Sequence, residues 1–398
     1  MHDLPDFRST AFLTNHVRDI LRFYDPVCVD AQGGFFHFFL DDGTVYDQHT
    51  RHLVSSTRFV FNYAQAARLF DREDYRERAR HGLRFLHQAH RQPHGGYAWL
   101  LEARGGSVHV LDGTRHCYGH AFVLLAHAAA LQAGIEEARP GLDACHTWMH
   151  EQFWQESEGL YADEATADGQ LLPYRGQNAN MHACEALIAA YDATGERRFL
   201  AQAKRIARRV TVDLAAEAGG LVWEHYGPDW RPDWDYNRDD PKHLFRPWGF
   251  QPGHQTEWAK LLLTLHAREP QPWLPTRAKD LFDTAVARAW DEAHGGLVYG
   301  VDPQGRVCDG DKYFWVQAES LAAAARLALQ TGDSSYWDWY DRLWTYAWEH
   351  FVDHEHGAWY RILDRENRKY GNEKSPAGKT DYHTLGACLD VLAARAGA

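Results

Sequence analysis

Apolar residues recur at helical spacing along almost the whole chain, in segments of two alternating kinds. One kind is rich in alanine and other small residues, and the other carries charges on one face. The small-residue segments span residues 51–70, 118–133, 180–194, 253–267, 315–331 and 380–396. The charged kind comprises residues 9–24 and helices beginning near residues 74, 139, 196, 275 and 334. The pattern therefore predicts twelve helices in alternating order.

Glycines mark an internal repeat in this series. Gly34, Gly96, Gly159, Gly220, Gly296 and Gly357 are each followed by aromatic or aliphatic residues, at intervals of 62, 63, 61, 76 and 61 residues. Self-similarity at such a period is typical of arrays of one supersecondary unit. Each unit contains a short predicted hairpin, a small-residue helix, a turn and a charged helix.

Six such units predict an all-α fold, an (α/α)6 barrel of twelve helices in two rings with short β-hairpins at one end. The small-residue helices can pack closely inside, while the charged helices face water. An open solenoid is the alternative, but the helix at residues 9–24 supplies a partner for the last inner helix and favours closure. We expect residues 1–398 to form one domain, although this length would also fit two or three domains.

The long interval contains a loop at residues 226–249 that is rich in Trp, Pro and Asp. Long loops inside compact domains are often functional. The acidic and amide residues that alternate from Asp233 to Asp239 resemble the beginning of a calcium loop, but Arg238 occupies the position that requires glycine. We therefore reject a calcium site and predict that the loop forms a lid over a pocket.

Composition narrows the functional classes. The net charge of −13 disfavours a nucleic-acid groove or an anionic membrane surface. The six cysteines form no CxxC pair and predict reduced thiols, and no signal peptide or run of about 18 apolar residues is visible. These features predict a cytoplasmic protein. The 16 Trp, 19 Tyr and 25 His suit a pocket that stacks on sugar rings and moves protons.

Three histidines lie at equivalent repeat positions, at the starts of inner helices. Asn180 is the predicted N-cap of the helix that carries His182. His254 is followed at helical spacing by Glu257, a carboxylate that could orient the imidazole, and His383 begins the last inner helix. Each histidine alone could be structural, but three at equivalent positions predict one shared pocket. The entrance would also include the Tyr118, Asn178, Trp315 and Glu319 side chains, with Arg58 one or two turns inside.

Three motifs are similar to those of the N-acylglucosamine 2-epimerase family. Residues 175–186 read Arg-Gly-Gln-Asn-Ala-Asn-Met-His-Ala-Cys-Glu-Ala, residues 252–258 read Pro-Gly-His-Gln-Thr-Glu-Trp, and residues 381–383 read Asp-Tyr-His. The resemblance covers essentially the whole chain. The Asn-Ala-Asn-Met-His-Ala form is most similar to the aldose–ketose isomerase branch of that family.

This resemblance implies a site without metal or cofactor that binds a small monosaccharide. The residues it implies are Arg58, Tyr118, Asn178, His182, His254, Glu257, Glu319 and His383, and it places the acidic part of the long loop, including Asp235, near the pocket. It also implies interconversion of D-mannose and D-fructose, extended to D-lyxose and D-xylulose, through a cis-enediolate. His383 and His254 would transfer protons, with Glu257 fixing His254, while His182 would help to open the ring and Arg58 would stabilise the enediolate.

Two other activities remain open from the sequence. A mannose or glucose 2-epimerase would use the same site and return the proton to the other face of C2. A glycoside hydrolase or lyase could share the barrel, but hydrolases need two carboxylates beside the bond, and this pocket is predicted to be rich in histidine. The oligomeric state, and which histidine faces C2, are not specified by the sequence.

Overall fold

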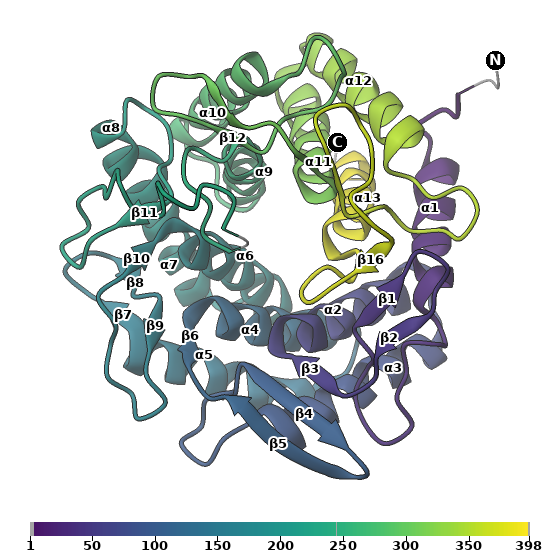
Figure 1. The fold of residues 1–398 in the computed structure, drawn as a ribbon. Coiled ribbons are helices and arrows are strands. Elements are labelled where there is room, and N and C mark those ends of the chain that lie inside the picture. The colour runs from purple at the N-terminus through teal and green to yellow at the C-terminus, as the bar shows by residue number, and fades with distance from the viewer. Residues whose placement is uncertain (1–3, 244, 397–398) are drawn as a thin grey trace.

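Twelve long helices form two concentric rings in a computed structural model that describes residues 4–243 and 245–396. The inner ring consists of α2 (Leu53–Phe70), α4 (Cys117–Gln132), α6 (Gln177–Thr194), α9 (Pro252–Arg268), α11 (Phe314–Thr331) and α13 (Tyr382–Ala396). The outer ring consists of α1 (Thr10–Tyr24), α3 (Glu73–Phe85), α5 (Arg139–Phe153), α7 (Arg197–Arg208), α10 (Trp273–Ala289) and α12 (Ser335–His350). The predicted (α/α)6 architecture is confirmed (Figure 1).

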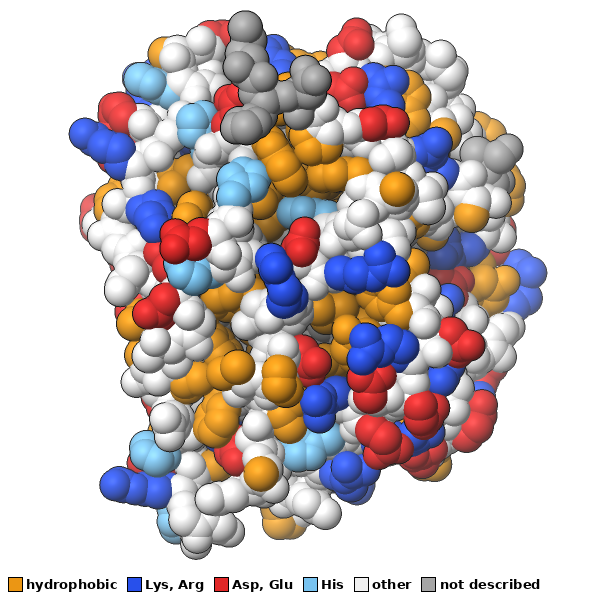
Figure 2. Space-filling view, turned by 90° about the vertical axis from the view of Figure 1, so that its right-hand side faces the viewer, with side chains coloured by type: hydrophobic (Ala, Val, Ile, Leu, Met, Phe, Trp, Pro, Cys, Tyr) orange, Lys and Arg blue, Asp and Glu red, His pale blue; other side chains and the backbone are white. Residues whose placement is uncertain are grey.

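The distribution of apolar residues explains which helices lie inside. Nearly every residue of α4 is buried, as expected for a helix that is apolar on all sides. In contrast, α7 buries one stripe that includes Phe199, Leu200 and Ile206 and exposes its arginines. Figure 2 shows the flank formed by α1 and α12, where basic and acidic side chains are interspersed. In the part of the chain that the structure describes, no helix is long and apolar enough to cross a membrane.

Contacts between the two ends of the chain close the ring. The last inner helix, α13, packs against α11, against α2 and against the N-terminal helix α1. Tyr24 of α1 donates a 2.6 Å hydrogen bond to Asp381, immediately before α13. The first helix therefore completes the outer ring beside the last inner helix, and the open solenoid is ruled out.

All of the strands lie at one end of the barrel, because they occur only where the chain passes from an outer helix to the next inner helix. Two sheets have three strands, in the orders β16-β1-β2 and β3-β4-β5, and the other strands form five antiparallel pairs. The strands are β1 (Phe38–Leu40), β2 (Val45–Asp47), β3 (Thr50–His52), β4 (Leu100–Arg104), β5 (Ser107–Asp112), β6 (Arg115–His116), β7 (Trp154–Gln155), β8 (Leu160–Tyr161), β9 (Glu164–Ala165), β10 (Arg175–Gly176), β11 (His225–Tyr226), β12 (Gly300–Val301), β13 (Val307–Asp309), β14 (Lys312–Tyr313), β15 (Ile362–Leu363) and β16 (Glu373–Ser375). Short helical pieces complete the description: η1 (Leu86–His90), η2 (Glu136–Ala138), η3 (Arg209–Leu214) and α8 (Ala215–Glu217).

The repeated glycines form the tight turns of these hairpins. Gly296, for example, has a φ of 77°, in the left-handed region that glycine adopts without steric cost. A polar side chain at the start of the following inner helix then bonds the backbone N–H of the residue after the turn. This contact recurs in five units, as His120 with Tyr97, Asn180 with Tyr161, Gln255 with Val222, Gln317 with Leu297 and Asp381 with Trp359, at 2.8–3.3 Å.

This recurring contact corrects the predicted N-cap. Helix α6 begins at Gln177, with Gly176 as its N-cap, so Asn180 already lies inside the helix. The Asn180 side chain accepts a bond from Tyr161 N–H at 2.8 Å and donates to Tyr161 C=O at 3.0 Å. Its role is therefore to attach the hairpin to the inner helix, and His182 lies in the second turn of α6.

Candidate active site

A cavity of about 430 Å³ opens at the hairpin end of the inner ring, where the N-termini of all six inner helices meet. Of the residues predicted for the site, eight line this cavity: Arg58, Tyr118, Asn178, His182, His254, Glu257, Trp315 and His383. They come from α2, α4, α6, α9, α11 and α13. The ring therefore brings together side chains from positions 58 to 383.

Each of the three histidines is paired with a glutamate through the same ring nitrogen. The Nδ1 atoms of the three rings lie 3.0, 2.9 and 2.7 Å from carboxylate oxygens, in the pairs His182–Glu185, His254–Glu224 and His383–Glu319. A carboxylate can only accept a hydrogen bond, so Nδ1 carries the proton in each pair. This leaves Nε2 as the basic nitrogen of each ring.

The histidine at position 254 has a different partner from the one predicted. Glu224, which follows the hairpin turn at Gly220, lies 2.9 Å from the Nδ1 atom of His254. Gln177 donates to the same carboxylate at 2.8 Å. Glu257 shares a helix with His254, but its carboxylate lies 4.0 Å from Nδ1 of His182. The prediction that Glu257 fixes His254 is therefore wrong, and Glu224 takes that role.

Glu257 occupies a different chemical state from the other glutamates. It is almost fully buried, and neither of its oxygens has a hydrogen-bond partner among the described residues. Burial raises the pKa of Glu257 well above its ordinary value, and repulsion from Glu319 adds to this effect. The raised pKa favours the protonated form of Glu257, and a protonated carboxyl beside the cavity can donate a hydrogen bond to an oxygen of a bound molecule.

Burial favours the neutral form of His182 and His383. Burial lowers the pKa of His383 well below its ordinary value, and the nearby Arg58 charge lowers it further. Burial also lowers the pKa of His182, although the bond to Glu185 opposes this effect. A neutral imidazole that is bonded through Nδ1 can serve as a base through Nε2.

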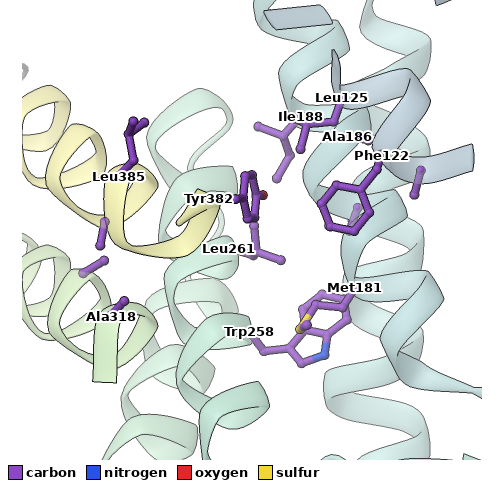
Figure 3. Close-up of a cluster of buried hydrophobic side chains, with 14 of the residues drawn as sticks. Phe122, Leu125, Met181, Ala186, Ile188, Trp258, Leu261, Ala318, Tyr382 and Leu385 are labelled. Atoms are coloured by element: carbon purple, nitrogen blue, oxygen red, sulfur yellow. The ribbon is translucent and has the colours of Figure 1, made fainter. Parts of the chain in front are cut away.

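The guanidinium of Arg58 is fixed from several sides. Its Nη2 atom lies 3.2 Å from the Tyr118 hydroxyl and 3.3 Å from His383 Nε2. Its carbon lies 4.3 Å from the ring centre of Phe122 and 4.7 Å from that of Tyr382, a cation–π arrangement on both sides. These two rings point toward each other across the barrel interior (Figure 3). The cation is therefore held beside His383 before any ligand binds.

The remaining predicted residues take different positions. The Trp315 ring lies between two histidines, 5.0 Å from the His254 ring centre and 5.8 Å from that of His383. Asn178 lines the cavity, and its buried amide oxygen has no hydrogen-bond partner among the described residues. Glu319 lies behind His383 as its partner. Asp235 is exposed and pairs with Arg238. It is not among the residues that line the cavity, although the next two residues, Tyr236 and Asn237, are.

The long loop does cover the cavity, but through other residues. The lining includes its side chains Asn237, Phe245 and Arg246. The guanidinium of Arg246 forms an ion pair with Glu164 and lies 3.9 Å above the Tyr174 ring centre. Sequence reasoning identified the loop as a cover but missed Arg246, because its two partners lie more than 70 residues earlier in the chain.

Two groups of histidine and glutamate come close enough to hold a metal ion. They are His182 with Glu185 and Glu257, and Glu257 with Glu319 and His383. In both groups the histidine and one glutamate already bond each other, and the shared Glu257 favours its neutral form. Divalent ions require deprotonated ligands. An ion at either group would therefore have to displace the proton of Glu257.

Comparisons with known proteins identify the family. Residues 34–387 match the family described as N-acylglucosamine 2-epimerase (GlcNAc 2-epimerase). The chain belongs to this family. It is 54% identical over 390 residues to the D-mannose isomerase of Marinomonas mediterranea, covering 98% of both chains, and 42% identical over 291 residues to that of Thermobifida fusca, covering 72% and 71%.

Solved structures of relatives share the architecture. A crystal structure of a D-mannose isomerase superposes with a TM-score of 0.96 at 54% identity, covering 98% of this chain and 100% of that one. The cellobiose 2-epimerase of Bacillus thermoamylovorans superposes with a TM-score of 0.83 at 17% identity, covering 96% and 99%. The second likeness concerns the fold alone.

Proposed function

We propose that this protein is an aldose–ketose isomerase that interconverts D-mannose and D-fructose, and also D-lyxose and D-xylulose, by metal-independent proton transfer. The observation that carries the proposal is the set of three imidazoles, each bonded through Nδ1 to a glutamate and each lining one cavity. The similarity of the chain to D-mannose isomerases over nearly its full length supports mannose as the aldose.

The reaction begins with opening of the sugar ring, because only the open aldehyde acidifies the proton on C2. We assign this step to His182, which lies 4.0 Å from the neutral acid Glu257. The imidazole can take the proton of the O1 hydroxyl as the C1–O5 bond breaks, and an acid at this position can return a proton to O5.

Isomerisation then moves one proton between neighbouring carbons. His383 or His254 removes the C2 proton through Nε2, and the electron pair forms the C1–C2 double bond of a cis-enediolate while charge develops on O1. Return of the proton to C1, with transfer of the O2 proton to O1 and formation of the C2=O2 bond, gives the ketose. The fixed Arg58 cation beside His383 stabilises the developing charge without needing to move.

A 2-epimerase is the second candidate, and the family match supports it. Epimerisation needs a proton donor on the opposite face of C2, and imidazoles on α6, α9 and α13 surround the cavity from several sides. A glycoside hydrolase is a weaker candidate, because Glu185 and Glu319 are already hydrogen-bonded partners of imidazoles.

The proposed function is tested by product analysis. The purified protein is incubated separately with D-mannose, D-fructose, D-lyxose and D-glucose, and the products are separated by chromatography. Fructose from mannose, and mannose from fructose, is the expected result. Glucose as the main product from mannose would establish the epimerase instead, and absence of any conversion would refute both.

A further inference from the structure

A second cavity, here named the basal cavity, occupies the opposite end of the inner ring. It measures about 930 Å³ and is lined by the C-terminal parts of the inner helices, including Gln132, Asp192 and Arg268. Its lining also includes Glu185 and Glu319, the hydrogen-bond partners of His182 and His383. The basal cavity therefore approaches the catalytic histidines from behind.

A buried lysine lies at the inner end of the basal cavity. Lys260 of α9 has a side chain that is only 8% exposed, and it lines the basal cavity together with Glu319 and Asp390. Its Nζ atom is 2.5 Å from Glu319 Oε2 and 3.7 Å from Asp390 Oδ2. The other oxygen of Glu319 lies 2.7 Å from His383 Nδ1. One carboxylate thus connects the lysine to the histidine.

The charges around Lys260 keep its side chain protonated. Four carboxyl groups face it from four helices: Glu185 of α6, Glu257 of α9, Glu319 of α11 and Asp390 of α13. Burial raises the pKa of Glu319, and the Lys260 charge is the largest influence that opposes this effect. Burial lowers the pKa of Lys260, but the charges of Glu319 and Asp390 outweigh it and raise the pKa above the ordinary value. Lys260 therefore stays charged at neutral pH.

We propose that Lys260 is a positioning residue for His383. Its ammonium holds Glu319 as a carboxylate, the carboxylate keeps the proton of His383 on Nδ1, and the unprotonated Nε2 faces the sugar. Without the ammonium, Glu319 would be buried without its counter-charge and would take up a proton. A neutral Glu319 would no longer stabilise the imidazolium that forms when His383 accepts the C2 proton.

The kinetic part of the test rests on the proposed function and compares two variants. In Lys260→Met a side chain of similar length replaces the lysine without its charge. We expect kcat for mannose isomerisation to fall by about 10- to 100-fold, the range for losing a group that supports a functional histidine, while KM changes little because Lys260 does not contact the sugar cavity. The acidic limb of the pH profile should move to higher pH, because Glu319 becomes easier to protonate. In Lys260→Arg, which keeps the charge, kcat and the position of the acidic limb should both return close to the wild-type values.

Arg326→Met is the matched control. Arg326 lies 2.5 Å from the other oxygen of Asp390 and also lines the basal cavity, but its ion pair is with Asp390 and not with Glu319. Its loss should leave the pH profile unchanged. If Lys260→Met does not fold, the double variant Lys260→Met/Asp390→Asn removes one carboxylate with the cation and serves in its place. A wild-type kcat and acidic limb in the folded variant would overturn the proposal.

A measurement without turnover separates this inference from the proposed function. The Nδ1 proton of His383 can be observed by NMR and assigned by its loss in His383→Asn. We expect its resonance to move in Lys260→Met but not in Arg326→Met. An unchanged resonance would refute the role of Lys260 even in an active enzyme, whereas a moved resonance in a protein that does not isomerise mannose would refute only the proposed function.

Discussion

Replacement of His383 by asparagine isolates proton transfer from the other functions of the cavity. The His383 ring lies at the start of α13, with Nδ1 bonded to Glu319 and Nε2 3.3 Å from Arg58. The asparagine amide reaches about as far as Nδ1 and can donate to Glu319 in its place. It cannot accept a proton at the position of Nε2, so only the base is lost.

The structure sets the size of each effect. Loss of a general base should lower kcat by at least about 10²-fold, which corresponds to about 2.7 kcal/mol in activation free energy. Stability should fall by only about 1–2 kcal/mol, because the buried carboxylate keeps a donor and the loss is mainly ring contacts. KM should stay within a few-fold, because the fixed Arg58 and Trp315 remain.

His120→Asn is the matched control for a buried histidine. His120 lies at the same end of α4, but it accepts a bond from Tyr97 N–H at 3.0 Å and stacks on Trp148, 4.2 Å away between ring centres. This variant should lose stability by a similar amount and keep kcat.

The assay that decides is proton exchange. Both variants are incubated with mannose or fructose in D₂O, and NMR follows deuterium at C1 and C2 together with product formation. If His383→Asn exchanges and isomerises at close to the wild-type rate, His383 is a structural histidine and the assignment of the base is refuted.

Three further predictions follow from the charges in the site. Glu224→Gln should lower kcat by about 10²-fold or more, because His254 loses the charge that stabilises its protonated form; wild-type kcat and KM in this variant would contradict the pairing of His254 with Glu224. Glu257→Gln should keep KM within a few-fold of the wild-type value, because the amide replaces an acid that is already neutral. Burial raises the pKa of Asp163 from 3.8 to about 8, so its contribution to stability is fully present below about pH 4 and is lost progressively as pH rises to 8. Asp163→Asn should therefore raise the unfolding midpoint by several degrees at pH 9 and by clearly less at pH 5; an equal gain at both pH values would refute this reasoning. Activity should survive dialysis against EDTA, since the proposed proton transfers use imidazoles and carboxyl groups alone; loss that a divalent ion restores would contradict the mechanism.

The fold was predictable because every repeat unit contains the same two sequence features, an alanine-rich helix and a glycine turn. The helices that bury all of their faces are rich in alanine, and the hairpin turns need glycine in the left-handed region, as at Gly296. Both features are visible without coordinates. The start of α6 could not be predicted in the same way, because asparagine is a common N-cap residue and Asn180 was therefore assigned to that position. Its partner, Tyr161, is brought beside it only by the hairpin.

The site was predictable at the level of the cavity lining and not at the level of pairing. The spacing of three residues suggested that Glu257 orients His254, but the same spacing occurs between His182 and Glu185, where the structure has the contact. Sequence spacing identifies side chains that lie on one face of a helix. It does not tell which of them bind each other and which bind a side chain from another element. Glu224 could be identified as the partner of His254 only once β11 was placed beside α9.

The partners of the histidines also explain why the site depends on closure of the ring. Glu319 reaches His383 from the neighbouring inner helix α11, and Lys260 reaches Glu319 from α9, the next helix in the ring. A movement between α11 and α13 would separate His383 from its carboxylate and leave both groups buried without partners, which is costly. The charges that prepare the base for proton transfer therefore also oppose opening of the barrel beside it. For this reason, substitutions of His383, Glu319 or Lys260 should lower activity and stability together. Substitutions of Trp315, which contributes only to the cavity wall, should do so less.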